Sequence, residues 1–215
     1  MQPITLFTYF LVAAEALAAI SAWASWSKWK GSYLKWFAPY LSVIVLLEFS
    51  IRILNYSKNY ETAAILKLIP VLLEVLFIHW FFYQTLPAKY KNWVMAGAGI
   101  FLFSFFYEKF ILNAEGYYFK SLSYTIGILF ILIYLIILII DLVKSDKVLI
   151  IQKLTIFWIA LGMLVFYLGA FPFYGLYNEL AKDIDLFITV AWVATTLNYC
   201  MYILFSIGFI WGKPH

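Results

Sequence analysis

Ionisable side chains inside long apolar segments are the residues of this sequence that could do chemistry. Glu15, Glu48, Arg52, Lys67 and Glu74 all lie within apolar runs long enough to cross a bilayer. A charged group at mid-bilayer costs about 3 kcal/mol, so each must pair with an opposite charge, face a bundle interior or border water. These groups are therefore candidates for carrying a proton or for binding an ion, a zwitterion or a polar lipid headgroup.

Spacing along the predicted helices indicates which of these groups could meet. At a rise of about 1.5 Å per residue, Glu15 and Glu74 both fall about 18–20 Å below the outer surface, near the midplane. Neither has an evident cation at its own depth. Glu48 and Arg52 are four residues apart, which suits an ion pair on one helix face, and Lys67 lies at a similar depth.

Uncharged polar residues and a proline add to this group. Tyr167 and Asn198 reach a comparable depth in the last two predicted helices. Pro70 lies between Lys67 and Glu74 and predicts a kink or a small cavity, because proline cannot donate a backbone hydrogen bond.

Two interpretations of these groups stay open. The first is that seven residues converge on a polar pocket open to the external face: Glu15, Glu48, Arg52, Lys67, Glu74, Tyr167 and Asn198. The second is that the charges only neutralise one another and hold the helices in register. We expect the first to hold for Glu15 and Glu74, whose charges lack an evident partner.

Composition predicts the fold that must position these residues. Hydrophobic residues make up 66% of the 215 residues and charged residues 12%, which is too little polar surface for a domain surrounded by water. A bilayer-spanning helix needs about 20 apolar residues. We therefore predict an all-α integral membrane protein, a single domain over residues 1–215 built as a seven-helix bundle. The predicted helices are residues 3–26, 34–56, 62–86, 92–113, 118–143, 149–176 and 184–211.

The distribution of basic residues predicts the orientation. One set of alternate connections, with the C-terminus, holds nine lysines against Asp141 and Asp146: Lys28, Lys30, Lys35, Lys89, Lys91, Lys144, Lys147, Lys153 and Lys213. On the opposite side basic and acidic residues nearly balance. The positive-inside rule then predicts a multi-pass cell-membrane protein with an external N-terminus and a cytoplasmic C-terminus. Residues Met1 to Thr5 lack a basic n-region, so we expect the first helix to remain as an anchor.

Several classes of protein lack their required residues here. Residues 184–211 contain no lysine for a rhodopsin-type Schiff base, and His79 and His215 are too few for a seven-helix zinc hydrolase. Nucleophile-elbow, P-loop and zincin motifs are missing from the sequence. Lys28, Lys30 and Lys35 are too few for a polybasic site. We expect no cofactor, no metal and no nucleic-acid partner.

Some polar and small residues have a simpler interpretation. We expect His79 to be a hydrogen-bonded packing residue, and Glu108 and Lys109 to lie at the wet outer boundary. The small residues Ala14, Ala18 and Ala22, and those of residues 96–99, permit close approach of a neighbouring helix, which we expect within the chain.

The functional hypothesis is a non-enzymatic, receptor-like or sensory protein that binds a small polar ligand or ion in the pocket. Its expected partners are membrane lipids, that ligand, and a cytoplasmic or membrane protein that supplies the output. The main alternative is a small transporter or proton-coupled carrier that titrates Glu15 or Glu74. Two further alternatives are a structural subunit of a membrane complex and a lipid-modifying enzyme with unfamiliar acid–base chemistry.

Overall fold

The structure, a computed structural model, describes residues 3–111, 121–145 and 148–213. Within these ranges the regular elements are helical, apart from one isolated parallel bridge between Leu154 and Lys213. The elements in chain order are α1 (Pro3–Ala24), η1 (Trp26–Trp29), η2 (Tyr33–Trp36), α2 (Phe37–Tyr56), α3 (Tyr60–Leu66), α4 (Leu68–Thr85), η3 (Ala88–Tyr90), α5 (Lys91–Phe110), α6 (Ser121–Lys144), η4 (Val148–Lys153), α7 (Thr155–Gly175), α8 (Tyr177–Leu180) and α9 (Ile184–Trp211). The prediction of an all-α protein is confirmed.

Five helical segments are long and apolar enough to cross a membrane. They are Tyr33–Tyr56, Tyr60–Thr85, Leu122–Lys144, Thr155–Gly175 and Ile184–Trp211. The apolar part of α1 over Phe10–Ala24 is shorter. The structure therefore supports a multi-pass membrane protein, while the count of seven crossings and the orientation stay predictions.

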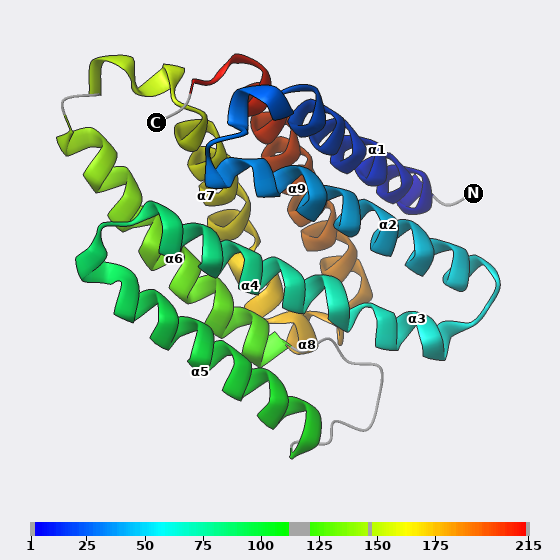
Figure 1. Cartoon of the computed structure of the whole chain (residues 1–215). Coiled ribbons are helices and arrows are strands. Elements are labelled where there is room, and N and C mark those ends of the chain that lie inside the picture. Colours follow the sequence, from blue (N-terminus) through cyan, green and yellow to red (C-terminus); the bar gives the residue numbers. More distant parts are fainter. Residues whose placement is uncertain (1–2, 112–120, 146–147, 214–215) are drawn as a thin grey trace.

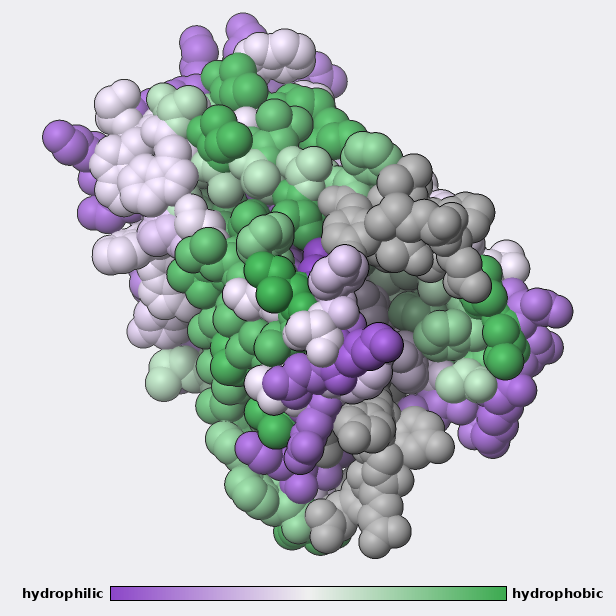
Figure 2. Space-filling model, turned by 90° about the vertical axis from the view of Figure 1, so that its right-hand side faces the viewer, coloured by the Kyte–Doolittle hydropathy of each residue, from purple (hydrophilic) through white to green (hydrophobic). Residues whose placement is uncertain are grey.

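Large apolar side chains cover much of the outside of the bundle. Leu46, Phe103, Ile136 and Leu168, on four different helices, are all exposed. Figure 2 shows one face, on which hydrophobic residues form a broad area and hydrophilic residues gather at the margins and in one central patch. Such a surface suits lipid rather than water.

The predicted third crossing, residues 62–86, is broken near its start. α3 ends at Leu66 and α4 begins at Leu68, with Lys67 between them. Pro70 has no N–H to donate to the carbonyl of Leu66, which explains why the helix breaks at this turn. In Figure 1, α3 and α4 follow one another across the front of the bundle with a bend between them.

Other helix ends differ from the prediction by a few residues. The segment at 149–176 begins as the 3₁₀ turns of η4, and α7 starts only at Thr155. The segment at 34–56 likewise opens with η2, and α1 stops at Ala24 rather than residue 26. The predicted ends at 112–113 and 118–120 lie outside the described residues.

Glycines bring α7 and α9 into close contact. A Cβ on Gly162 of α7 would lie 3.1 Å from the Met201 carbonyl oxygen, and one on Gly208 of α9 would lie 2.9 Å from the Trp158 Cβ. α9 also packs against α1, on which Ala18 and Ala22 are buried. On α5, a Cβ at Gly97 would collide with the hydroxyl of Tyr134 from α6. Ala18, Ala22 and Gly97 therefore pack within the chain, as expected, whereas a Cβ on Gly99 would meet nothing within 4 Å, so Gly99 does not pack in this way.

The prediction that Glu108 lies at a wet boundary is wrong. Glu108 is only 8% exposed, and its carboxylate accepts hydrogen bonds from the Ser123 N–H at 3.0 Å and the Ser123 hydroxyl at 2.6 Å. It also accepts one from the Leu122 N–H at 3.4 Å. Because the first N–H groups of a helix lack partners within it, this acid on α5 caps the N-terminus of α6. Lys109 is exposed, as expected.

The end of the bundle nearer η1 and η3 contains a dense aromatic core, defined here as Phe37, Phe77, Phe81, Phe205 and Phe209. Phe37 lies at its centre, with ring centroids 4.9 Å from Phe77, 5.4 Å from Phe81 and 5.7 Å from Phe209. Phe37, Phe81 and Phe209 are at most 1% exposed. The aromatic core thus ties α2, α4 and α9 together.

Candidate functional site

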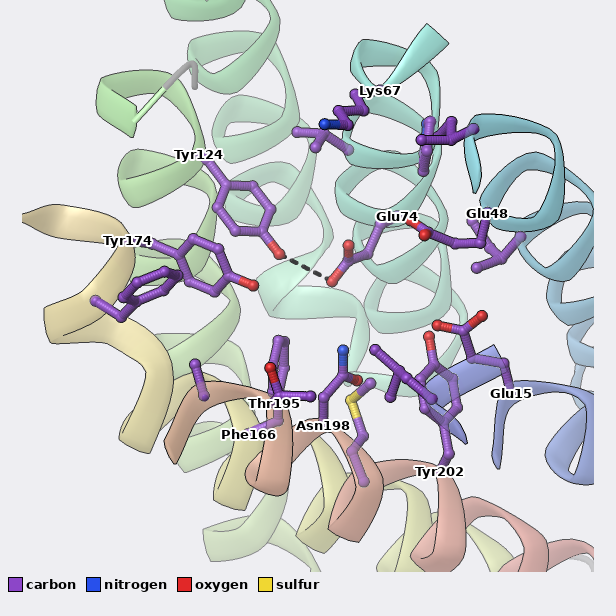
Figure 3. Close-up of a pocket in the computed structure, with 18 of the residues that line it drawn as sticks. Glu15, Glu48, Lys67, Glu74, Tyr124, Phe166, Tyr174, Thr195, Asn198 and Tyr202 are labelled. Carbon is purple, nitrogen blue, oxygen red and sulfur yellow. Dashed lines mark hydrogen bonds between the residues drawn. The ribbon is translucent and has the colours of Figure 1, made fainter. Parts of the chain in front are cut away.

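A polar cavity of about 350 Å³ lies between the helices at the end of the bundle away from the aromatic core. It is lined from α1, α2, the α3–α4 junction, α6, α7 and α9. Five of the seven predicted site residues line it: Glu15, Glu48, Lys67, Glu74 and Asn198. Figure 3 shows their side chains entering the same space from different helices.

Glu74 of α4 is held by two tyrosines. Its Oε1 accepts a hydrogen bond from the Tyr124 hydroxyl of α6 at 3.1 Å and another from the Tyr167 hydroxyl of α7 at 2.5 Å. Tyr167 is fully buried and does not line the cavity, but its hydrogen bond holds the Glu74 carboxyl group in place. Two donors on one oxygen fix the position of the Glu74 carboxyl group relative to α6 and α7.

Glu15 of α1 is the least satisfied of the cavity acids. The residue is 3% exposed, yet its Oε2 has no hydrogen-bond partner among the described residues. Its carboxylate points into the cavity near the hydroxyl of Tyr202, as Figure 3 shows. A buried carboxyl oxygen without a partner is costly, so the fold retains at this position a group that water or a ligand would satisfy.

Glu48 and Arg52 form the ion pair that their spacing predicts. The Arg52 guanidinium lies 3.6 Å from the Glu48 carboxylate on α2. Glu48 borders the cavity, whereas Arg52 is not among the residues that line it. Lys67 is exposed and forms no ion pair with any described residue. Lys67 therefore lies at the mouth of the cavity, where the break between α3 and α4 places it.

Asn198 and Thr195 reach the cavity from α9. The Oδ1 of Asn198 is buried without a hydrogen-bond partner in the described part of the chain. The Thr195 hydroxyl donates to the Ala191 carbonyl at 2.8 Å, a bond within its own helix. Asn198 thus adds a second unsatisfied acceptor to the same wall.

Four cavity tyrosines were missed by the sequence reasoning: Tyr40, Tyr124, Tyr174 and Tyr202. For three of them, helical spacing could have predicted the position. Tyr40 lies eight residues before Glu48, Tyr174 seven after Tyr167 and Tyr202 four after Asn198, which places each on the same helix face as a predicted site residue. Tyr124 had no such signal, because α6 carries no other polar residue of the site.

The cavity closes towards the aromatic core. Below Glu74 only about 10 Å³ of free space remains, between Phe37, Met163 and Phe205 among others. That volume is at the lower limit for one water molecule. The cavity therefore opens at one end of the bundle and is sealed at the other.

A separate apolar groove of about 650 Å³ runs along the outside of α2 and α4. Tyr40 borders both the groove and the cavity. Its ring stacks on Phe77 with centroids 3.8 Å apart and planes 4° apart. This stacked pair forms the wall between the polar interior and the lipid-facing side.

His79 lies outside the cavity, as the sequence predicts. It is 2% exposed, its Nδ1 lies 2.8 Å from the Val75 carbonyl, and its ring packs edge-on against Tyr134. Its Nδ1 is therefore bonded within its own helix, whereas its Nε2 is buried without a partner among the described residues.

The cavity can accept hydrogen bonds and positive charge but is not arranged for a metal. Nowhere in residues 3–111, 121–145 and 148–213 do three His, Cys, Asp or Glu side chains converge closely enough to hold a metal ion. The three cavity acids are spread over α1, α2 and α4, with apolar and aromatic side chains between them. A molecule with polar and apolar parts fits such walls better than a bare ion.

The helices and the cavity together define a class: a multi-pass α-helical membrane protein with a polar cavity inside its helix bundle. No known protein family, curated protein or solved structure matches the chain. The residues of the cavity are therefore the basis for assigning a function.

Proposed function

We propose that this protein is a receptor-like or sensory membrane protein that binds a small polar ligand or ion in the cavity. The observation that carries the proposal is the buried carboxyl group of Glu15, which lines a cavity also bordered by Glu48 and Glu74 and has one oxygen without a partner among the described residues. The cavity volume of about 350 Å³ lies within the usual range for small-molecule sites, about 300–1,000 Å³.

The proposal includes seven crossings and an external cavity mouth. α1 has 22 residues and α5 has 20, and each is about 30 Å long at 1.5 Å per residue, enough to span the hydrocarbon core. With α2, α3–α4, α6, α7 and α9 they make seven. The cell membrane and the external N-terminus follow from the lysine distribution.

The path from the cavity to the cytoplasmic end supports a sensory role. α9 carries Asn198 and Tyr202 in the cavity and ends beside Lys213, whose N–H donates to the Lys153 carbonyl at 2.6 Å. A ligand that shifted α9 would therefore also act on η4 and on the bridge at Leu154. A partner protein that contacts this end would supply the output.

A carrier is the second candidate, and one observation favours it. The broken helix α3–α4 lines the cavity, and α7 contains Pro172 next to the lining residue Phe173. Discontinuous helices at a central site are typical of secondary transporters. Flux of ligand or protons in proteoliposomes that depends on Glu15 or Glu74 would support the carrier, and binding without flux would support the receptor.

Cysteine labelling tests the accessible pocket. In a Cys200→Ser background, we expect Asn198→Cys in intact cells to react with a small, water-soluble thiosulfonate reagent. Met163→Cys, beside the sealed space below Glu74, is the matched control and should stay unreactive. Failure of Asn198→Cys to react would overturn the proposed function. In the same background, labelling of Lys58→Cys but not Lys89→Cys by an impermeant reagent would support the orientation.

A further inference from the structure

The charges around the cavity do not balance. Three acids border it, whereas Arg52 is paired with Glu48 and Lys67 is exposed at the mouth. Among the described residues, no lysine or arginine forms an ion pair with Glu15 or Glu74. An anion placed at their depth would lie between two carboxylates.

The remaining polar groups at this depth are also mostly acceptors. Glu15 and Asn198 each present a buried oxygen that has no partner among the described residues. The Tyr124 hydroxyl directs its proton to Glu74 and not to the open space of the cavity. A ligand that donates hydrogen bonds and carries positive charge would satisfy these groups at once.

The rest of the wall is apolar and aromatic. Tyr40, Tyr124, Phe166, Phe173, Tyr174 and Tyr202 supply six aromatic rings around a space also lined by aliphatic side chains such as Ile44 and Val71. Aromatic rings attract organic cations through their quadrupole, an effect that grows when the cation is desolvated. In Figure 3, Tyr124 and Tyr174 lie on one side of the space and Glu48, Glu15 and Tyr202 on the other, with Glu74 between them.

From these observations we infer that the ligand is a small organic ammonium ion, whose charged nitrogen lies between Glu15 and Glu74 and whose carbon atoms contact the aromatic wall. The inference rests on the proposed function, because it names the ligand class of the same cavity. Glu15 and Glu74 bind the ammonium group, and the amide oxygen of Asn198 completes its surroundings.

Labelling reagents of opposite charge test this inference directly. In the Cys200→Ser, Asn198→Cys protein in lipid nanodiscs, the probes are a trimethylammonium-bearing and a sulfonate-bearing thiosulfonate. We expect the cationic reagent to react at least about tenfold faster than the anionic one, after correction for their rates with a free thiol. Glu15→Gln should reduce that ratio several-fold. The exposed acid Glu61, changed to Gln, is the matched control and should leave the ratio unchanged.

Protection by 3,3-dimethylbutylamine, a primary ammonium ion at neutral pH, supplies the second readout. We expect it to slow the labelling of Asn198→Cys, while 3,3-dimethylbutanol, which carries a hydroxyl in place of the ammonium group, does not. Equal reaction with both reagents and equal protection by both compounds would overturn the cation class but leave an accessible polar pocket. Protection by a zwitterion such as γ-aminobutyrate without protection by 3,3-dimethylbutylamine would likewise overturn the cation class. Absence of any labelling at Asn198→Cys would overturn the pocket itself.

Discussion

The two ends of the bundle are built from the same helices but in opposite ways. Around the aromatic core, α2, α4 and α9 interlock through fully buried phenylalanines. Around the cavity, the same helices carry Glu48, Glu74 and Asn198 and leave about 350 Å³ open. Stability in this protein is therefore concentrated at one end, and the capacity to bind at the other.

This division has a physical reason. Interlocking apolar side chains lose contacts when any one of them is shortened, so a dense core tolerates little change. A cavity bordered by unsatisfied acceptors, by contrast, stabilises the fold only when a ligand or water binds in it. A substitution in the aromatic core should therefore lower the free energy of unfolding. A substitution in the cavity should instead lower the affinity for ligand.

The largest effect on stability is expected at Phe37. Phe37→Ala would leave a void among five aromatic rings and lower the free energy of unfolding by about 3–5 kcal/mol. Phe103→Ala is the matched control, because Phe103 on α5 is 73% exposed and leaves no internal void. Denaturant titration in detergent micelles measures both. Equal losses at the two positions would contradict the distinction between buried and lipid-facing rings.

The second effect concerns the contact between α7 and α9. Gly208→Ala would place a Cβ 2.9 Å from the Trp158 Cβ and 3.3 Å from the Thr155 carbonyl, so the helices must separate, at about 1–3 kcal/mol. Gly99→Ala on α5 meets nothing within 4 Å and should stabilise its helix by about 0.5–1 kcal/mol. The melting temperatures of the two variants should therefore shift in opposite directions. A Gly208→Ala protein that melts no lower than the unmodified protein would show that α9 does not pack closely against α7.

A third effect concerns the cap that positions a cavity residue. Glu108→Ala removes the acceptor for the first turn of α6, which also carries Tyr124, and should cost about 1–2 kcal/mol. Glu179→Ala removes only an exposed ion pair with Lys182 and should cost less than about 0.5 kcal/mol. Unfolding of the two alanine variants by denaturant measures both. Similar small losses would show that Glu108 is not a cap.

Much of this arrangement could be predicted from the sequence. The apolar runs predicted the helices because a bilayer demands both length and hydrophobicity. The cost of a charge in lipid singled out Glu15, Glu48, Arg52, Lys67 and Glu74, and all of them except Arg52 line the cavity. Residue spacing could not predict which helices contact one another across the bundle. It shows which residues share one face of a helix, but not which other helix packs against that face.

Two residues illustrate that limit. Glu108 looks like a boundary residue from its position near a helix end, and only the approach of α6 makes it a buried cap. Tyr124 looks like one aromatic among many, and only its hydrogen bond to Glu74, fifty residues away, places it in the site. The break at Lys67, by contrast, could be predicted as a kink, because Pro70 disrupts the hydrogen bonds of the helix that contains it.

A smaller effect is expected at the turn between α2 and α3. Lys58 has a φ of 62°, and its N–H donates to the Asn55 carbonyl while the Asn59 N–H donates to the Leu54 carbonyl. This is a Schellman motif, in which glycine normally occupies the left-handed position. Lys58→Gly should therefore stabilise the protein by about 0.5–1 kcal/mol. Melting of Lys58→Gly beside Lys89→Gly, which lacks this geometry, measures the gain, and a loss at position 58 would contradict it.

The smallest effect on stability, and the sharpest test of the division, is expected at Glu15. Glu15→Gln keeps the shape of a side chain whose Oε2 has no partner among the described residues, so the free energy of unfolding should change by less than about 0.5 kcal/mol. Thr155→Val is the comparison at the sealed end, because the buried Thr155 hydroxyl donates to the Gly208 carbonyl at 2.7 Å and its loss should cost about 1 kcal/mol. Chemical unfolding of both proteins without ligand gives the two values. If Glu15→Gln destabilised the protein as much as Thr155→Val or more, Glu15 would be part of the structural framework, and the polar end of the bundle would serve packing as the aromatic end does.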